Sequence, residues 1–127
     1  MDKKVKLLII EDDLFLLNMY ASKFELEGFD VVLAEDGEKG WKTAIKDMPD
    51  VILLDIMMPK MNGFEVLEKL KSDNKVSKIP VILLTNLSQK DEIERAMNLG
   101  AADFLIKAHF RPSEVVEKIK KLLNIEQ

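Results

Sequence analysis

Residues 51–55 read VILLD, and this continuous apolar run ending on an aspartate predicts a strand that is buried on both faces. Three further runs have the same form and end on polar residues suited to phosphoryl chemistry: LLIIEDD at 7–13, VILLT at 81–85 and DFLIK at 103–107. If the four runs are parallel strands, their ends meet at one edge of a sheet. That edge would gather acidic metal ligands, a carboxylate nucleophile, a hydroxyl donor and a cation, which together predict a phosphorylation site.

Apolar runs alternate with segments of helical period along the whole chain. Strands are predicted near 5–10, 30–34, 50–54, 80–84 and 102–106, with helices between them, for example at 36–46, 64–71 and 87–99, and one more at the C-terminal end. Five βα units in succession predict an α/β fold, a doubly wound parallel sheet with helices on both faces. For the strand order 2-1-3-4-5, the order reverses between the first and third strands, which places Asp12 beside Asp55.

Two helices have apolar stripes that are expected to face the sheet. In the last helix the stripe consists of Val115, Val116, Ile119, Leu122 and Leu123. In the first helix it consists of Leu16, Met19, Tyr20 and Phe24, which leaves Leu14 and Leu17 on an adjoining face.

Length and composition narrow the class of protein. The 127 residues, 47% of them hydrophobic, suffice for one core, so a single domain over residues 1–127 is expected, with no effector domain. The absence of cysteine excludes a disulfide framework and a thiolate metal site. The 19 basic and 23 acidic residues, a formal net charge of −4, argue against direct nucleic-acid binding. The start of the chain fits neither a signal peptide nor a membrane span, and a cytoplasmic location is the default expectation.

A cation is expected between the neighbouring carboxylates, because Asp12 and Asp55 would otherwise repel each other. Mg²⁺ or Mn²⁺ is favoured, since such ions accept one or two carboxylates and leave room for water and phosphate oxygens. With no cysteine and a single, distant histidine, other transition metals are disfavoured. In this arrangement the Asp55 carboxylate can attack phosphorus, the Lys107 ammonium can stabilise charge, and Thr85 can donate its hydroxyl to a phosphoryl oxygen.

The motifs IIEDD (9–13), DIMMPKMNG (55–63), LLTN (83–86) and FLIK (104–107) resemble, in order and separation, the receiver domains of two-component response regulators, including single-domain chemotaxis regulators. The resemblance covers the whole chain and implies a flavodoxin-like receiver fold. It also implies a signalling switch that catalyses only its own phosphorylation and slow dephosphorylation, rather than an enzyme.

The resemblance implies a role for each site residue. Asp55 would accept the phosphoryl group from a phosphohistidine of a sensor histidine kinase or a histidine phosphotransfer protein. The metal ligands would be Glu11, Asp12, Asp55 and the backbone carbonyl of Met57. Phe104 would be the switch aromatic, which turns inward as Thr85 moves toward the phosphate.

The resemblance also suggests partner surfaces. Leu14 and Leu17 would contact the histidine donor, because that face of the first helix docks it in receivers; extra core packing is the alternative. Output would run through the fourth helix, the fifth strand and the last helix to an unidentified protein target, with no membrane partner. A monomer or a weak phosphorylation-dependent dimer is expected, because Ile93 stands where a basic residue would help a dimer.

Three features depart from the family pattern. Ala108 follows Lys107 where the family commonly has proline after a cis bond, so either that bond persists or the loop differs. Asn86 stands where a small residue often lines the phosphoryl entrance, which would narrow access. Met57 and Leu87 would flank the line of water attack without a polar group to position the water, which predicts slow self-dephosphorylation.

Each signal taken alone has a simpler interpretation. An acidic cluster after a strand is usually a solvated turn and helix start, Thr85 is a candidate helix cap, and Phe104 is a candidate core residue. Two other functional classes remain open. An aspartate-nucleophile phosphatase would favour a second aspartate in place of Met57, and a pseudo-receiver would lack phosphorylation altogether. The joint occurrence of the acids, Thr85 and Lys107 favours the phospho-acceptor.

Overall fold

The computed structural model describes residues 4–125. Strands and helices alternate along the chain as β1 (Lys6–Ile10), α1 (Leu14–Leu26), β2 (Asp30–Ala34), α2 (Gly37–Asp47), β3 (Val51–Leu54), α3 (Gly63–Ser72), β4 (Val81–Thr85), α4 (Lys90–Asn98), β5 (Asp103–Ile106), the 3₁₀-helix η1 (Lys107–His109) and α5 (Pro112–Leu122). Within the described range, no helix combines the length and the apolar character needed to cross a bilayer.

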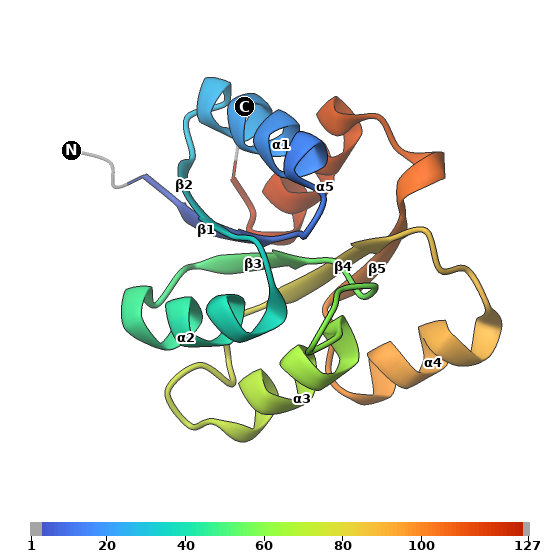
Figure 1. Ribbon diagram of the computed structural model, residues 1–127. Helices are drawn as coiled ribbons and strands as arrows, with labels where there is room; N and C mark the ends of the chain where they lie inside the picture. Colours follow the sequence, from blue (N-terminus) through green and yellow to red (C-terminus); the bar gives the residue numbers. More distant parts are fainter. Residues whose placement is uncertain (1–3, 126–127) are drawn as a thin grey trace.

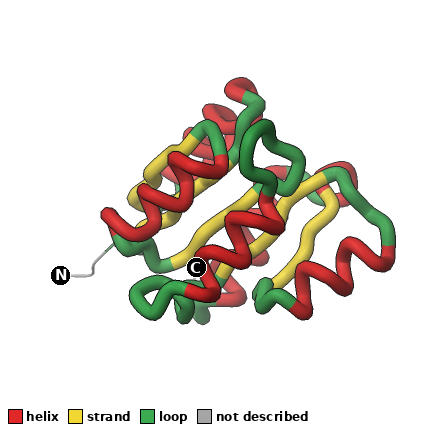
Figure 2. Tube along the Cα trace, turned by 60° about the horizontal axis from the view of Figure 1, so that its bottom comes forward, coloured by secondary structure: helices red, strands yellow, loops and turns green. Residues whose placement is uncertain are grey.

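The strands form one parallel sheet with the order β2-β1-β3-β4-β5. Figure 1 shows α1 and α5 on one face of this sheet and α2, α3 and α4 on the other. Figure 2 shows the same layers from a second direction, with the strands running between the helices. The predicted fold class and strand order are therefore confirmed. The order reverses between β1 and β3, so a ligand site is expected at the carboxyl ends of these two strands.

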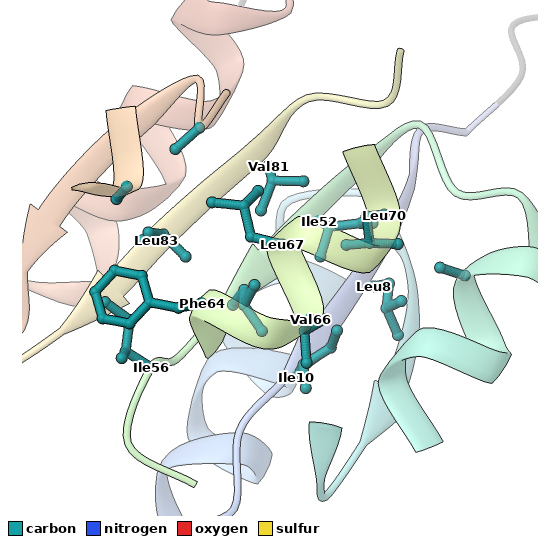
Figure 3. Packing of buried hydrophobic residues seen from close by; sticks show 14 of the residues in the cluster. Leu8, Ile10, Ile52, Ile56, Phe64, Val66, Leu67, Leu70, Val81 and Leu83 are labelled. Atoms are coloured by element: carbon teal, nitrogen blue, oxygen red, sulfur yellow. The ribbon is translucent and has the colours of Figure 1, made fainter. Parts of the chain in front are cut away.

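Two apolar layers hold the sheet between its helices. Figure 3 shows the layer beneath α3, where Leu67 and Leu70 lie close to Ile52 of β3. The opposite layer is filled from α1 and α5 by side chains such as Phe24 and Val115. Because both faces of the sheet are covered, every residue of β3 and β4 is buried, as their continuous apolar runs predicted.

Most of the predicted boundaries lie within one residue of the observed ones. The exception is the helix predicted at 87–99, which begins only at Lys90, because Gln89 has an extended backbone and shares a capping box with Glu92. The turn η1 was not predicted. No cis peptide bond occurs in residues 4–125, so the peptide between Lys107 and Ala108 is trans.

The expected inward stripe of α5 is correct for Val115, Val116 and Ile119 but wrong for Leu122, which is 39% exposed. Lys120 is buried instead, and its Nζ donates to Glu27 Oε1 at 2.9 Å. A lysine can bury its aliphatic stem while its ammonium reaches a partner, so an apolar pattern does not reveal this position.

The inward stripe of α1 is also offset from the expected one. Its buried residues are Leu17, Tyr20, Ala21 and Phe24. Leu16 and Met19 are only half-buried. The offset arises because the small Ala21 completes an i, i+3, i+4, i+7 stripe that starts at Leu17.

Candidate functional site

The predicted site residues lie at the carboxyl ends of four strands. Glu11 follows β1, Asp55 follows β3, Thr85 ends β4 and Lys107 follows β5. The Asp55 N–H donates to the Ile10 carbonyl at 3.0 Å, which continues the hydrogen bonding between β1 and β3 by one residue. Because parallel strands end at the same edge, the sheet brings these side chains together from distant parts of the sequence.

Three carboxylates form the acidic part of the site. One oxygen from each of Glu11, Asp12 and Asp55 lies within 4.8 Å of the others. Glu11 and Asp55 are almost completely buried, whereas Asp12 is open to solvent. Carboxylate oxygens grouped around a partly open position match the preference of Mg²⁺, which takes one or two carboxylates and keeps several waters. The donor set therefore fits a hard divalent cation.

Lys107 supplies a positive charge to this cluster. Its Nζ donates to Glu11 Oε1 at 2.7 Å and to Asp55 Oδ2 at 3.3 Å. Burial alone would lower the pKa of Lys107, but the hydrogen bond to Glu11 and the charges of Asp55 and Glu11 outweigh it and raise the pKa above its ordinary value. The ammonium is consequently charged at neutral pH.

Glu11 has the opposite balance. Burial raises the pKa of its carboxyl above the ordinary value, against hydrogen bonds from Lys107 and from the Asp13 N–H that favour the charged form. The bond from Asp13 joins its N–H to Glu11 Oε2 at 3.0 Å. Glu11 is therefore held on both of its oxygens, once by Lys107 and once by the backbone at the start of α1.

Backbone contacts also fix the loop that follows Asp55. The Ile56 N–H donates to Asp55 Oδ1 at 2.7 Å, and the Gly63 N–H donates to the Ile56 carbonyl at 2.8 Å. A Cβ at position 63 would overlap the Asp55 carbonyl oxygen, so only glycine permits this close approach. The loop leaves Met57 62% exposed beside the site.

Thr85 is completely buried at the end of β4, where the Leu87 N–H donates to its Oγ1 at 3.4 Å. It does not cap α4, whose N-cap is Gln89, so the interpretation of Thr85 as a helix cap is wrong. Asn86 is exposed and Leu87 is half-buried. Leu87 and Met57 both line a cavity of about 500 Å³, and Ile56, the residue after Asp55, lines it as well.

The simpler interpretation of the acidic run at 11–13, a helix start, applies to Asp13. Asp13 caps α1, because its Oδ1 accepts from the Leu16 N–H at 3.1 Å. Phe104 is half-buried on β5, where its backbone pairs with Leu83 and its side chain packs against the layer beneath α3.

The exposed face of α1 differs from the expected one. For Leu17 the alternative of extra core packing is confirmed and the donor-contact prediction is wrong, because this side chain is 4% exposed and belongs to the core. Leu14 is 55% exposed, and Phe15, which the stripe analysis left out, is 76% exposed. Because the predicted stripe began at Leu16, it did not show that the neighbouring Phe15 points away from the core. A stripe that begins at Leu17, as observed, would have shown this.

Known proteins share this sequence pattern. The chain matches the family model of the response regulator receiver domain over residues 7–120. It is 37% identical to the DNA-binding dual master transcriptional regulator RpaA of Synechocystis sp. and 33% identical to the alkaline phosphatase synthesis transcriptional regulatory protein PhoP of Bacillus subtilis, in each case over 118 residues. Each match covers 93% of this chain and 48% of the relative, so the chain spans about half the length of these curated relatives.

Solved structures agree with the sequence match. The response regulator receiver domain protein (CheY-like) from Methanospirillum hungatei JF-1 superposes with a TM-score of 0.90 at 27% identity, over 96% of this chain and 95% of that chain. The range matched by the family model includes β1 from its second residue, the other four strands, and the acidic, threonine and lysine positions at the strand ends. The chain therefore belongs to the family of response regulator receiver domains.

Proposed function

We propose that this receiver domain is a phospho-acceptor switch in a two-component phosphorelay, with Asp55 as the acceptor. The main support is the combination of an almost buried carboxylate, a lysine bonded to it at 3.3 Å and two further acids within 4.8 Å. Each oxygen of Asp55 already has a donor, Ile56 N–H on Oδ1 and Lys107 Nζ on Oδ2. The nucleophile is thus held in one orientation, which removes part of the entropic cost of the transfer.

The proposed donor is a phosphohistidine of a sensor histidine kinase or a histidine phosphotransfer protein. An Asp55 oxygen attacks phosphorus, a P–O bond forms as the P–N bond breaks, and the departing imidazole nitrogen takes a proton from water. Lys107 balances charge on the phosphoryl oxygens, and Thr85 donates its hydroxyl to one of them. The products are an acyl phosphate on Asp55 and neutral histidine on the donor.

Glu11, Asp12 and Asp55 are proposed to hold Mg²⁺ or Mn²⁺, with the Met57 carbonyl as a further ligand. When bound, the ion supplies positive charge that draws phosphoryl oxygens toward the carboxylate. Asp12 is the exposed member of the cluster, which supports its proposed role as the ligand that hydrated metal meets first.

The signal is proposed to pass from Thr85 to Phe104. These residues lie on the neighbouring strands β4 and β5, so movement of Thr85 toward the phosphoryl group changes the packing beside Phe104. The proposed output face comprises α4, β5 and α5. An unidentified target protein would detect the change in this face by direct contact. The chain is proposed to act as a monomer or a weak phosphorylation-dependent dimer.

Leu14 and the adjacent Phe15 are proposed to dock the histidine donor, because both are exposed apolar side chains on the first turn of α1, next to Asp12 and Asp13. RpaA is described as DNA-binding, but each of these matches spans about half of the relative. With a net charge of −4, direct nucleic-acid contact is not proposed for these residues.

Intact-protein mass after incubation with acetyl phosphate and Mg²⁺ tests the proposal. The wild type should gain one phosphoryl group, whereas the Asp55→Ala variant and a sample with chelator should not. Asp91→Ala, an exposed aspartate on α4, is the matched control and should be phosphorylated like the wild type. A wild type with neither adduct nor Mg²⁺ binding would favour a pseudo-receiver, and turnover of a phosphate ester would favour a phosphatase.

A further inference from the structure

Met57 is the most exposed methionine in the described part of the chain, at 62% of its surface, against 48% for Met48 and 44% for Met97. The neighbouring Met58 is 9% exposed. Oxidation of a thioether to a sulfoxide depends on access of the oxidant to sulfur. The structure therefore predicts an order of oxidation in which Met57 reacts before the other methionines named here.

The position of Met57 gives its oxidation state a consequence. The side chain lines a cavity of about 500 Å³ together with Leu87, two residues from Asp55 in sequence. The other residues that line the cavity are Ile56, Met58, Asn62, Phe64 and Glu92. The lining is therefore mostly apolar, and it includes Ile56, whose N–H donates to Asp55 Oδ1 at 2.7 Å.

The two polar residues of this cavity are engaged at helix starts. Asn62 Oδ1 accepts from the Glu65 N–H at 3.0 Å, where it caps α3. Glu92 Oε1 accepts from the Gln89 N–H at 3.2 Å, at the start of α4. The thioether of Met57 is itself only a weak acceptor. A strong acceptor on residue 57 would thus be the one in this cavity that lies nearest to Asp55 in sequence.

We propose that Met57 is an oxidative modification site, and that its sulfoxide shortens the lifetime of phosphorylated Asp55. This inference rests on the proposed function of Asp55 as phosphoryl acceptor. The oxidant is a hydroperoxide. A sulfur lone pair attacks the terminal peroxide oxygen, an S–O bond forms as the O–O bond breaks, and the remaining oxygen leaves as water or an alcohol after taking a proton. Sulfur loses two electrons and the peroxide gains them.

The sulfoxide oxygen carries a strong dipole on a flexible, solvent-exposed side chain. It can accept a hydrogen bond from water at the mouth of the site and orient that water toward phosphorus, which the thioether does not do. A single added hydrogen bond of ordinary strength in the transition state corresponds to an acceleration of about fivefold. Reduction by methionine sulfoxide reductases reverses the modification.

The first measurement maps oxidation and needs no phosphorylation. The full chain is treated with a limiting amount of hydrogen peroxide, and peptide mass spectrometry locates the sulfoxides. Met57 is expected to react first, ahead of Met48 and Met97, with Met58 among the last. Prior oxidation of Met48 or Met97 would overturn the assignment of Met57 as the modification site.

The second measurement follows loss of the phosphoryl adduct by intact mass in reduced and oxidised protein. The oxidised wild type should dephosphorylate about fivefold faster than the reduced wild type, the factor of one hydrogen bond, and reductase treatment should restore the slower rate. In Met57→Leu the rate should be the same before and after peroxide. Met97→Leu, which removes an exposed methionine far along the chain, should respond to peroxide as the wild type does.

An unchanged or longer lifetime of the adduct after oxidation of Met57 would overturn the inference. It would also be overturned if peroxide accelerated dephosphorylation of Met57→Leu as much as that of the wild type. These results leave the phospho-acceptor role intact, because the adduct still forms on Asp55. A chain that takes up no phosphoryl group in either oxidation state would instead overturn the proposed function and this inference with it, even if the oxidation map places the first sulfoxide on Met57.

Discussion

Met57 and Leu87 are proposed to influence the lifetime of an acyl phosphate at Asp55. Met57 and Leu87 line the same cavity beside the site, and neither offers a strong acceptor to water. A carboxylate or amide at these positions would orient an attacking water and assist removal of its proton. Slow self-dephosphorylation therefore stays a prediction, supported by the apolar character of these two side chains.

Replacing Met57 by Asn and Leu87 by Glu together is expected to shorten the lifetime of the phosphoryl adduct by about tenfold or more, a modest share of what a positioned acid or base supplies. The decay of the adduct can be followed by intact mass after removal of acetyl phosphate. Met97→Asn, which makes an exposed methionine of α4 polar outside this cavity, serves as the control and should decay as the wild type does. A double variant with an unchanged or longer lifetime would contradict the prediction.

A second residue pair links α1 to α5 outside the site. Lys120 donates to Glu27 Oε1 at 2.9 Å, and this hydrogen bond, with the charge of Lys120, lowers the pKa of Glu27. A carboxyl whose pKa is lowered by folding stabilises the protein above its ordinary pKa, and the contribution disappears as the pH falls through the lowered value. The pair is therefore expected to weaken in acid.

Lys120→Met should return the pKa of Glu27 toward its ordinary value, as measured by NMR titration of the carboxyl carbon. The difference in unfolding free energy between wild type and this variant should also shrink as the pH falls from about 5 to about 3. Glu27→Gln removes the ionisable carboxyl itself, so the difference in unfolding free energy between the wild type and Glu27→Gln should shrink over the same pH range. A difference that stays constant over this range would show that Lys120 acts through packing rather than through its charge.

At the scale of elements, α2 packs against β1 through a glycine. A Cβ on Gly40 would lie 2.5 Å from Ile10 Cδ1 and 2.8 Å from two further carbons of the same side chain. Ile10 is completely buried, so it has little room to move away. The close approach of the helix to the strand therefore depends on the missing side chain at position 40.

Gly40→Ala is expected to lower the free energy of unfolding by about 1–3 kcal/mol, the usual range for overpacking a core. Urea unfolding followed by the fluorescence of Trp41, the single tryptophan, measures the change. Adding Ile10→Val removes the nearest carbon and should recover part of the loss. Gly28→Ala is the control, because a Cβ at position 28 meets no atom within 4 Å. The stability that this variant loses arises from the φ of +93° at Gly28, so Ile10→Val should not restore it. If the losses of unfolding free energy caused by Gly40→Ala and Ile10→Val simply add in the double variant, the steric explanation is contradicted.

At the scale of the whole molecule, the acidic edge of the sheet opposes folding unless its charge is balanced. Lys107 balances part of it, since it bonds to Glu11 and Asp55. A cation that binds only the folded arrangement of carboxylates adds to stability by mass action. The proposed metal binding is therefore expected to be coupled to global unfolding.

Mg²⁺ at one hundred times its dissociation constant is expected to raise the free energy of unfolding by about 2.7 kcal/mol, and a chelator should reverse the effect. Thermal unfolding in MgCl₂ and in NaCl of equal ionic strength separates specific binding from screening. Asp12→Asn should lose most of the Mg²⁺ effect while keeping the fold, because Asp12 is exposed and asparagine has nearly the same size. An Asp12→Asn variant that Mg²⁺ stabilises as much as the wild type would contradict the proposed ligand set.

Much of the fold follows from local sequence. Continuous apolar runs such as 51–54 can be satisfied only in strands covered on both faces, and five strands separated by helical segments leave few topologies besides the observed sheet. The candidate site also follows, because Asp55, Thr85 and Lys107 stand at strand ends whatever the side-chain packing. Helix boundaries were less certain where capping decides them, as at Gln89.

The sequence by itself determined the order of elements, the sheet and which residues stand at its carboxyl edge, because these depend on apolar periodicity and on strand ends. Only the tertiary structure decided which sides of α1 and α5 are buried, since that depends on neighbours that no local pattern contains. Leu17 is thus in the core, Phe15 is exposed, and Lys120 is buried against Glu27. The bonds from Lys107 to Glu11 and Asp55 span 96 and 52 residues of sequence, so their geometry exists only once the sheet has formed.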